Sequence, residues 1–363
     1  MPDLRTIDLE PAAGDPGGEW RGPILEVRDL TVHFPSDDGL VKAVDGITFD
    51  VLPNETLGIV GESGSGKSVT SMAILGLLPK TALITGSVKF RGRELLGLRE
   101  NELQPLRGQS IAMVFQDALA ALNPVFTVGA QIAEAIKVHH EVNSKDLRER
   151  GVELLNIVGI PNPSERFDNY PHEFSGGMRQ RAMIAMSIAN EPDVLIADEP
   201  TTALDVTIQA QVLEVLERIQ DRTSSSILLI THDLGVVAGT ADRVMVMYAG
   251  REAEVGTVED IFYNPRHPYT RGLLASLPRV DGRRGDRLHR IVGQPPSLIV
   301  LPTGCAFHPR CNDARVPGPC NDQRPELHLV EDAHSSACHY AEDLPALSTT
   351  DLAADAEETA SDD

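Results

Sequence analysis

The chain has 363 residues, 41% hydrophobic and 24% charged, which is enough for one large α/β domain with an appendage or for two modest domains. Its formal net charge of -22 argues against nucleic acid as the main partner. No run of 18 apolar residues encodes a transmembrane helix, and the N-terminal residues lack the basic and apolar regions of a secretory signal. We therefore expect a cytoplasmic protein that works at a membrane only if other subunits hold it there.

Much of the acidic charge lies at the two ends. Residues 1–23 hold five acids and two bases and contain several Pro and Gly residues, so they read as a flexible leader. Residues 341–363 hold eight acids and no Lys or Arg. This segment can bury too little apolar surface to offset the cost of ordering, which predicts a disordered acidic tail.

A phosphate-binding loop is predicted after the first strands. Residues 24–34 alternate as a strand does, and residues 47–51 and 56–60 are further strand candidates. The last of these leads into residues 61–68 (GESGSGKS), a complete match to G-x-x-x-x-G-K-[ST], and residues 67–78 then read as a helix. In such a loop, backbone amides and the helix N-terminus bind phosphate, the lysine lies between the β- and γ-phosphates, and the serine hydroxyl ligates Mg²⁺. The predicted ATP contacts in this loop are Gly61, Ser63, Gly64, Ser65, Gly66, Lys67, Ser68 and Val69.

The middle of the chain alternates between strand and helix patterns. Residues 110–115 read as a strand, and residues 117–190 are mostly helical in pattern with breaks at Pro residues. Residues 194–197 and 227–230 are short apolar runs suited to buried parallel strands, and residues 206–222 between them read as a helix. This alternation predicts a mostly parallel sheet with crossover helices. The pattern loosens after residue 257, where we place a domain boundary.

Two acids close the strand at residues 194–197. An acid at the carboxyl edge of a parallel strand, beside a phosphate loop, is placed to hold Mg²⁺, and Asp198 fits that role. Glu199 then points at the space beyond the γ-phosphate, where it can polarise a water for in-line attack. Residues 61–68 and 194–199 together predict a P-loop ATPase with Glu199 as the catalytic base.

Four further features make the chain resemble the nucleotide-binding subunit of an ABC transporter. Residues 174–178 (FSGGM) resemble the ABC signature, residues 202–205 (TALD) resemble the D-loop, Gln116 stands where the family has its Q-loop, and His232 where it has its switch histidine. The fold this implies is a P-loop NTPase cassette with a RecA-like core, an antiparallel β-subdomain and a helical signature subdomain. The resemblance also implies hydrolysis of ATP.

The resemblance implies a head-to-tail dimer of ATPase domains. ATP would lie between the phosphate loop of one subunit and Ser175, Gly176 and Gly177 of the other, whose amides begin an apparent helix and can bind a γ-phosphate. In the family the switch histidine contacts the γ-phosphate, the Q-loop glutamine senses Mg²⁺ and the attacking water, and the D-loop contributes Asp205. Phe34 resembles the aromatic residue that stacks on adenine, or is a core residue of its strand.

Segments after residue 200 look like the ATPases of dipeptide and oligopeptide importers. They are residues 201–212, 230–238, 246–250, 264–274 and 293–311. The sequence of residues 230–238 (ITHDLGVVA) resembles the D-type subunit more than its F-type partner. This implies an ATPase domain at residues 24–257, a C-terminal transporter-type region at residues 258–340, and a place on the cytoplasmic face of the membrane. It also implies as partners an F-type ATPase or a second copy, two permease subunits and an extracytoplasmic peptide-binding protein. Residues 116–140 should dock the permease, although Ala118 replaces the usual proline.

All four cysteines lie between residues 305 and 338, at Cys305, Cys311, Cys320 and Cys338. In a cytoplasmic chain such a cluster suggests a metal before disulfides, either a [4Fe-4S] cluster or a tetrahedral Zn²⁺. The paired C-x2-C spacing of many zinc sites is absent, and peptide-importer subunits of this kind are thought in some cases to carry a cluster here. We favour iron–sulfur, with zinc next and free thiols last.

Two other functions stay open at this point. The same motor serves nickel or other small solutes in related importers, and the ATPase subunit does not contact the cargo. A soluble ABC ATPase is the other alternative, although such proteins typically carry two cassettes or a long coiled-coil insertion, and this chain shows neither.

Overall fold

The computed structural model describes residues 20, 22–117, 121–202, 204–277 and 290–344. Most of the predicted leader, nearly all of the predicted acidic tail and Ala118 lie outside these residues. None of the described helices is both long and apolar enough to cross a membrane.

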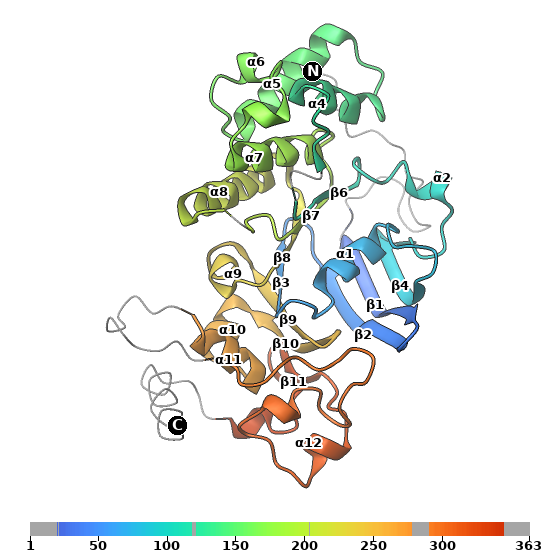
Figure 1. Cartoon of the computed structure of the whole chain (residues 1–363), viewed down its shortest axis with the longest axis vertical. Helices are drawn as coiled ribbons and strands as arrows, with labels where there is room; N and C mark the ends of the chain where they lie inside the picture. Colours follow the sequence, from blue (N-terminus) through green and yellow to red (C-terminus); the bar gives the residue numbers. More distant parts are fainter. Residues whose placement is uncertain (1–19, 21, 118–120, 203, 278–289, 345–363) are drawn as a thin grey trace.

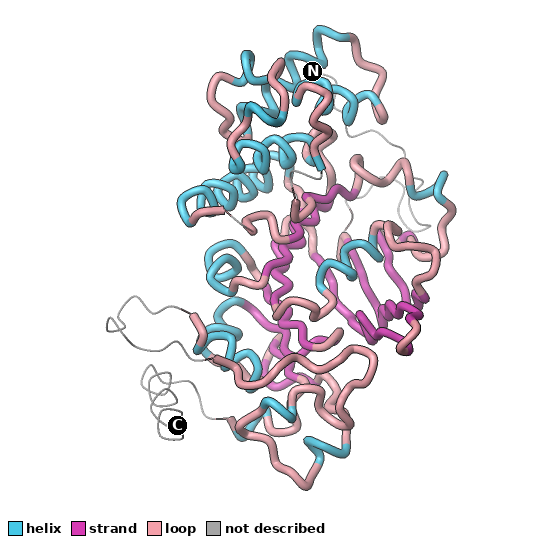
Figure 2. The backbone as a smooth tube through the Cα atoms, in the orientation of Figure 1, coloured by secondary structure: helices cyan, strands magenta, loops and turns pink. Residues whose placement is uncertain are grey.

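A mixed sheet of eight strands runs through the middle of the molecule (Figure 2). Its order is β11-β12-β10-β9-β3-β8-β7-β6, with β3, β6, β7, β8 and β9 parallel and β10 antiparallel to β9. Its inner strands β3, β7 and β8 are buried throughout, which is why they read as continuous apolar runs. The bounds are β3 (Thr56–Val60), β6 (Ile111–Val114), β7 (Val194–Asp198), β8 (Ser226–Thr231), β9 (Arg243–Tyr248), β10 (Arg251–Thr257), β11 (His328–Glu331) and β12 (His334–Ser336).

A second, antiparallel sheet of four strands lies beside the first, in blue on the right of Figure 1. Its order is β2-β1-β4-β5, and the buried residues of β1 alternate with partly exposed ones over its first half. Helix α1 (Lys67–Ile74) packs between this sheet and the larger one, sharing an apolar cluster with both. The other bounds are β1 (Leu25–Ser36), β2 (Gly39–Val51), β4 (Leu83–Phe90), β5 (Arg93–Glu94) and α2 (Glu100–Leu103).

A layer of helices, in green at the top of Figure 1, lies beyond strand β6. Glycines let its segments approach closely, since a Cβ on Gly129 or Gly151 would lie 2.3 Å from an atom of the Phe167 ring. The layer confirms the helical pattern expected for residues 117–190, broken as expected near Pro124, Pro161 and Pro171. Its bounds, with the following α8, are α4 (Val128–Lys137), α5 (Ser144–Ile157), α6 (Pro163–Arg166), η1 (Pro171–Glu173), α7 (Gly176–Ser187) and α8 (Val206–Thr223).

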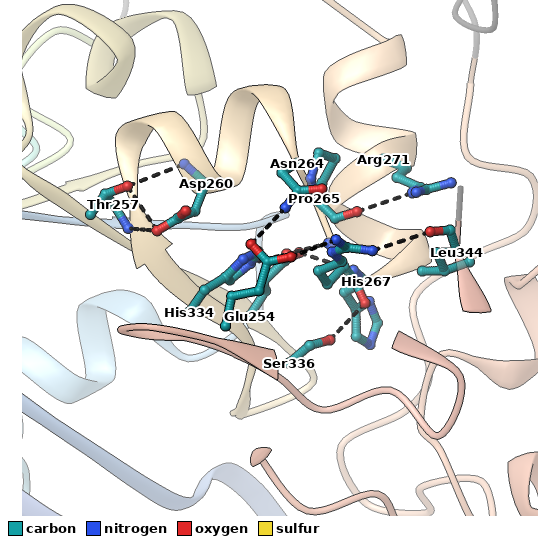
Figure 3. Close-up of polar contacts among 12 residues, drawn as sticks. Glu254, Thr257, Asp260, Asn264, Pro265, His267, Arg271, His334, Ser336 and Leu344 are labelled. Carbon is teal, nitrogen blue, oxygen red and sulfur yellow. Dashed lines mark hydrogen bonds and ion pairs between the residues drawn. The ribbon is translucent and has the colours of Figure 1, made fainter. Parts of the chain in front are cut away.

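The chain after residue 257 covers the other end of the sheet, in orange and red in Figure 1. The β11–β12 hairpin extends the large sheet beyond β10, and a buried carboxylate secures it, because Glu254 of β10 accepts a hydrogen bond of 2.8 Å from His334 Nε2 of β12 (Figure 3). The bounds of this part, with the preceding α9, are α9 (Leu234–Thr240), α10 (Val258–Tyr263), α11 (Pro268–Ala275), η2 (His308–Arg310), α12 (Pro319–Asp322) and η3 (Ala341–Asp343).

The helix after the glycine-rich loop is shorter than the sequence predicted. Helix α1 ends at Ile74, although the apolar pattern continues to residue 78. Gly76 takes a φ of +62°, a left-handed conformation that ends helices and that glycine adopts at low cost. A Cβ on Gly76 would also lie 2.9 Å from Leu103 Cδ1, so the chain turns there against the last residue of α2.

Candidate active site

The glycine-rich loop joins β3 to α1 in a shape that only glycines permit. Gly66 caps α1 with a φ of +105°, and a Cβ there would lie 2.3 Å from the carbonyl oxygen of Ala43. A Cβ on Gly61 would lie 2.2 Å from the carbonyl oxygen of Met247. The loop therefore folds tightly against strands β2 and β9 and leads into the N-terminus of α1, where helix amides can bind an anion.

Lys67 is buried inside this loop. Its ammonium donates hydrogen bonds of 2.7 Å to the carbonyl of Gly61 and 3.1 Å to the carbonyl of Glu62. Burial lowers the pKa of the ammonium, while Glu199, Asp198 and Glu62 oppose that shift. The lysine is thus held among loop atoms by bonds that a phosphate oxygen can replace.

Ser68 and Asp198 bring two oxygen ligands together. The Ser68 hydroxyl, in the first turn of α1, donates a hydrogen bond of 2.9 Å to Asp198 Oδ1 at the end of β7. Burial raises the pKa of Asp198, and this hydrogen bond and the nearby Lys67 oppose the rise. A buried carboxylate beside a hydroxyl fits Mg²⁺, a hard cation that prefers oxygen ligands and would restore the charged form of the acid.

Glu199 collects hydrogen-bonding side chains from three segments. Its Oε2 accepts from Gln116 Nε2 at 2.9 Å and from Thr202 Oγ1 at 2.8 Å, and His232 Nδ1 lies 3.3 Å away. Its backbone has a φ of +47°, a left-handed conformation that is uncommon outside glycine and that tends to occur at functional sites. Sequence reasoning did not predict Thr202 as a partner of Glu199, although its place three residues after the acid was a usable signal.

These groups surround one cavity of about 650 Å³. Its walls also include Ala43, Glu62, Leu273 and Leu298, which the sequence did not predict. Leu273 and Leu298 come from the region after residue 257, far from the ATPase motifs. Gly61, Ser65 and Asp198 are not among the described residues that line it, although Asp198 is hydrogen-bonded to the lining residue Ser68. The predicted site residues that line it are Ser63, Gly64, Gly66, Lys67, Ser68, Val69, Gln116, Glu199 and His232.

Another group of predicted site residues lies away from this cavity. Ser175 and Gly176 are exposed at the N-terminus of α7, where the Ser175 hydroxyl accepts a hydrogen bond of 3.3 Å from the Met178 amide. Gly177 is buried against α8, and the exposed Asp205 caps that helix by accepting from the Ile208 amide at 3.1 Å. None of them is among the described residues that line the cavity, so a single chain does not bring the signature to its own phosphate loop.

Phe34 is likewise absent from the described cavity walls. It lies on β1 opposite Val41 of β2 and packs, partly buried, against the apolar cluster that the two sheets share. In this arrangement it is a strand residue at the margin of a core, and its contact with adenine stays a prediction.

The four cysteines line one small cavity of about 20 Å³. Their thiols are free, and burial raises the pKa of Cys305, that of Cys311 to about 12 and that of Cys338 to about 11. Within the described part of the chain, no three His, Cys, Asp or Glu side chains are arranged to hold a metal ion. The structure therefore brings the four predicted ligands to one cavity but does not arrange them as the preformed metal site that the sequence predicted.

Comparison with known families gives matches to two sequence families. The family described as "ABC transporter" matches residues 44–202, and the family described as "Oligopeptide/dipeptide transporter, C-terminal region" matches residues 253–317. The first match contains the phosphate loop and Glu199. The second contains α10, α11 and the first two cysteines.

Curated relatives match over most of the chain. The dipeptide transport ATP-binding protein DppD of Bacillus subtilis is 52% identical over 317 residues, which are 87% of this chain and 94% of the relative. The oligopeptide transport ATP-binding protein OppD of Mycobacterium tuberculosis is 53% identical over 331 residues, 91% of this chain. The chain spans only about half of that longer relative, 54% of its length.

Solved structures share the cassette fold. The ATP-binding cassette MJ0796, solved as a dimer in a post-hydrolysis state with ADP and phosphate, has a TM-score of 0.59 and 23% identity, covering 64% of this chain and 98% of that one. The cbiO1 protein of Clostridium perfringens, part of the ABC transporter complex cbiONQ, has a TM-score of 0.56 and 29% identity, covering 66% and 90%. These similarities confirm the predicted cassette fold.

Proposed function

The chain belongs to the family of ABC transporter ATP-binding proteins that carry the oligopeptide/dipeptide transporter C-terminal region, and on that premise we propose that it is the ATPase subunit of a di- and oligopeptide importer. The observation that carries the proposal is the convergence of Lys67, Ser68 and Glu199 on one cavity, with Asp198 hydrogen-bonded to Ser68. We place the ATPase domain at residues 24–257 and the transporter-type region at residues 258–340.

The arrangement supports hydrolysis of ATP by direct attack of water. Loop amides and Lys67 bind the β- and γ-phosphates, and Ser68 and Asp198 hold Mg²⁺, which neutralises phosphate charge when bound. Glu199 accepts a proton from the attacking water as oxygen bonds to the γ-phosphorus and the bond to the β-phosphate oxygen breaks, which yields ADP and phosphate. Gln116 and His232 both contact the carboxylate of Glu199, and they orient this carboxylate and the water. The protein thus contributes positioning and electrostatics.

A complete site needs a second cassette. In this proposal Ser175, Gly176 and Gly177 of one subunit meet the γ-phosphate bound by the other, in a head-to-tail dimer with a second copy or an F-type paralogue. Support comes from the exposure of Ser175 and Gly176 at the start of α7, where the amides of the first turn and the helix dipole favour an anion. The exposed Asp205 at the start of α8 would lie in the same interface.

The permease docks beside the Q-loop in this proposal. Val125 and Phe126, in the turn before α4, are 70% and 53% exposed, and a hollow of about 410 Å³ on α4 is lined by Ala130, Ala133 and Val138 together with two charged residues. An exposed apolar patch of this kind suits a helix of a membrane partner. The proposal places the subunit on the cytoplasmic face of the membrane, with two permease subunits and an extracytoplasmic peptide-binding protein.

For the cysteine cavity we keep the [4Fe-4S] cluster as the proposed occupant. The donor set fits, because four cysteines from three segments line one cavity, and a bound cluster would take them as thiolates and join those segments. Iron and acid-labile sulfide in the anaerobically purified full chain test it. About four of each per chain, lost in Cys311→Ser, are expected; zinc, or no metal in either protein, would contradict the cluster.

Glu199→Gln in the reconstituted transporter tests the catalytic proposal. Glutamine keeps the size of the side chain but cannot accept the proton, so turnover should fall by about 10²- to 10⁴-fold while nucleotide binding persists. Glu217→Gln, at an exposed position on α8, is the matched control and should hydrolyse ATP at the wild-type rate. Hydrolysis at the wild-type rate in Glu199→Gln would show that another group is the base.

A further inference from the structure

Glu62, directly after the first glycine of the phosphate loop, is held from three sides. Its carboxylate accepts two parallel hydrogen bonds from Arg310, 2.6 Å from Nη1 to Oε2 and 2.9 Å from Nη2 to Oε1. Its amide donates to Tyr269 Oη at 2.8 Å, and its carbonyl accepts from Lys67 Nζ at 3.1 Å. One loop residue therefore joins the predicted phosphate-binding lysine to two side chains from the region after residue 257.

Arg310 is buried and fixed before any ligand arrives. Its side chain is 5% exposed, its Nε donates to the Val292 carbonyl at 3.2 Å, and its Nη1 donates to Tyr248 Oη at 3.2 Å. The guanidinium carbon lies 5.8 Å from the centre of the Tyr248 ring and 5.9 Å from that of Phe307. A bidentate pair to a carboxylate in such a setting is among the stronger and more directional interactions of a protein.

The segment that carries Arg310 also builds the cysteine cavity. Arg310 ends η2, with Phe307 before this short helix and Cys311 directly after it, and Phe307, His308 and Cys311 all line that cavity. The Phe307 ring packs on Tyr248 and Tyr269, with ring centres 5.2 Å and 5.3 Å apart. The position of the guanidinium is thus set by the fold of the C-terminal region.

The negative charge of Glu62 lies close to the predicted phosphate site, so its ion pair with Arg310 should affect nucleotide binding. Glu62 lines the phosphate cavity, where a nucleotide brings several negative charges. An unpaired carboxylate there would repel the phosphates, with a strength that grows in a partly buried site. Arg310 neutralises that carboxylate and pins the backbone whose carbonyls hold Lys67.

We propose that Arg310 is a positioning residue of the nucleotide site, which shapes and neutralises the phosphate loop through Glu62 and so makes nucleotide affinity depend on the C-terminal cysteine-containing region. This inference rests on the proposed nucleotide site, since Arg310 contacts the loop and not the cavity itself. It adds to that site a component contributed by residues far outside the ATPase motifs.

Calorimetric titration of the full chain with MgADP tests the proposal. Arg310→Met should weaken binding about 10-fold, within the usual range of coupling between distant groups. Glu62→Gln removes the charge that Arg310 neutralises, so the double variant Arg310→Met/Glu62→Gln should recover most of the lost affinity. A role limited to folding stability predicts no such recovery, because each change then removes a contact of its own.

Arg266→Met is the matched control. Arg266 lies in the same region, is 15% exposed and pairs with Glu331 at 2.8 Å, but no hydrogen bond joins it to the loop among the described residues. Its substitution should leave MgADP affinity within about twofold of wild type, as expected for a distant independent site. A loss equal to that of Arg310→Met would overturn the proposal in favour of a general loosening of the region.

A second variant keeps the test decisive if Arg310→Met does not fold. Arg310→Lys retains the charge but loses the bidentate geometry, so its affinity for MgADP should lie between those of wild type and Arg310→Met. If Arg310→Lys is the one variant of the two that folds, it should bind MgADP about threefold more weakly than wild type. Wild-type affinity in every folded Arg310 variant would refute the inference alone. Failure of the wild-type protein to bind MgADP would instead refute the proposed nucleotide site.

Discussion

The buried carboxylate of Glu254 offers the sharpest test of how the C-terminal region is attached. Glu254 is 0% exposed, and its oxygens accept from three donors, namely His334 Nε2 at 2.8 Å, the His267 amide at 3.1 Å and the Arg266 amide (Figure 3). The two amides begin the segment that leads into α11, and His334 belongs to the terminal hairpin. One side chain therefore joins β10 to both.

Glu254→Ala leaves these three donors buried without an acceptor. Each buried unsatisfied group costs about 1–3 kcal/mol, so the loss of one acceptor shared by three donors costs several kcal/mol. We expect the free energy of unfolding to fall by about 4 kcal/mol. With a urea dependence of about 3 kcal/mol per M for a protein of this size, the unfolding midpoint should fall by about 1.3 M.

Urea denaturation followed by far-ultraviolet circular dichroism measures this change. Glu254→Gln keeps an acceptor oxygen and should lose about half as much free energy, because its amide group faces donors. Glu331→Gln, at a side chain that is 50% exposed, should lose less than about 0.5 kcal/mol. A fall of less than about 1 kcal/mol for Glu254→Ala would refute the reasoning, because the donors would then have found other acceptors.

Two further predictions concern the phosphate loop and a buried acid. Gly66→Ala should weaken MgADP binding in calorimetry by more than about 10-fold, because its Cβ would lie 2.3 Å from a carbonyl oxygen and a φ of +105° is strained for alanine, whereas Gly239→Ala, with open space around it, should bind normally. Burial raises the pKa of Glu252 to about 7, so the folded protein retains a proton that the unfolded chain releases near pH 4.5. Stability from Glu252 is then present below pH 4.5 and is lost as pH rises to about 7, so Glu252→Gln should gain up to about 3 kcal/mol relative to wild type across that window in pH-dependent urea unfolding. An unchanged difference between pH 5 and pH 8 would show that the acid is already ionised at pH 5.

Short-range sequence patterns were enough to predict much of the secondary structure and the phosphate loop. Strands β3, β7 and β8 follow from apolar runs, and the loop at residues 61–68 follows from glycines, a lysine and a serine spaced along one continuous segment. The pairing of Gln116 and His232 with Glu199 agrees with placing each of them after a parallel strand, since such strand ends share one edge of a sheet. The sequence predicted too long a helix α1, because the spacing of apolar residues continues past Gly76.

What the sequence determined by itself is the chemistry carried by short continuous segments: a phosphate loop after β3, an acid pair at the end of β7 and a signature segment at the start of α7. Only the tertiary structure decided which distant groups complete them, such as Arg310 on Glu62, 248 residues apart, or Leu273 and Leu298 at the cavity wall. The physical reason is that a local motif carries its own geometry in its backbone preferences. An ion pair between distant segments is selected from 32 basic and 54 acidic side chains by the packing of the whole chain.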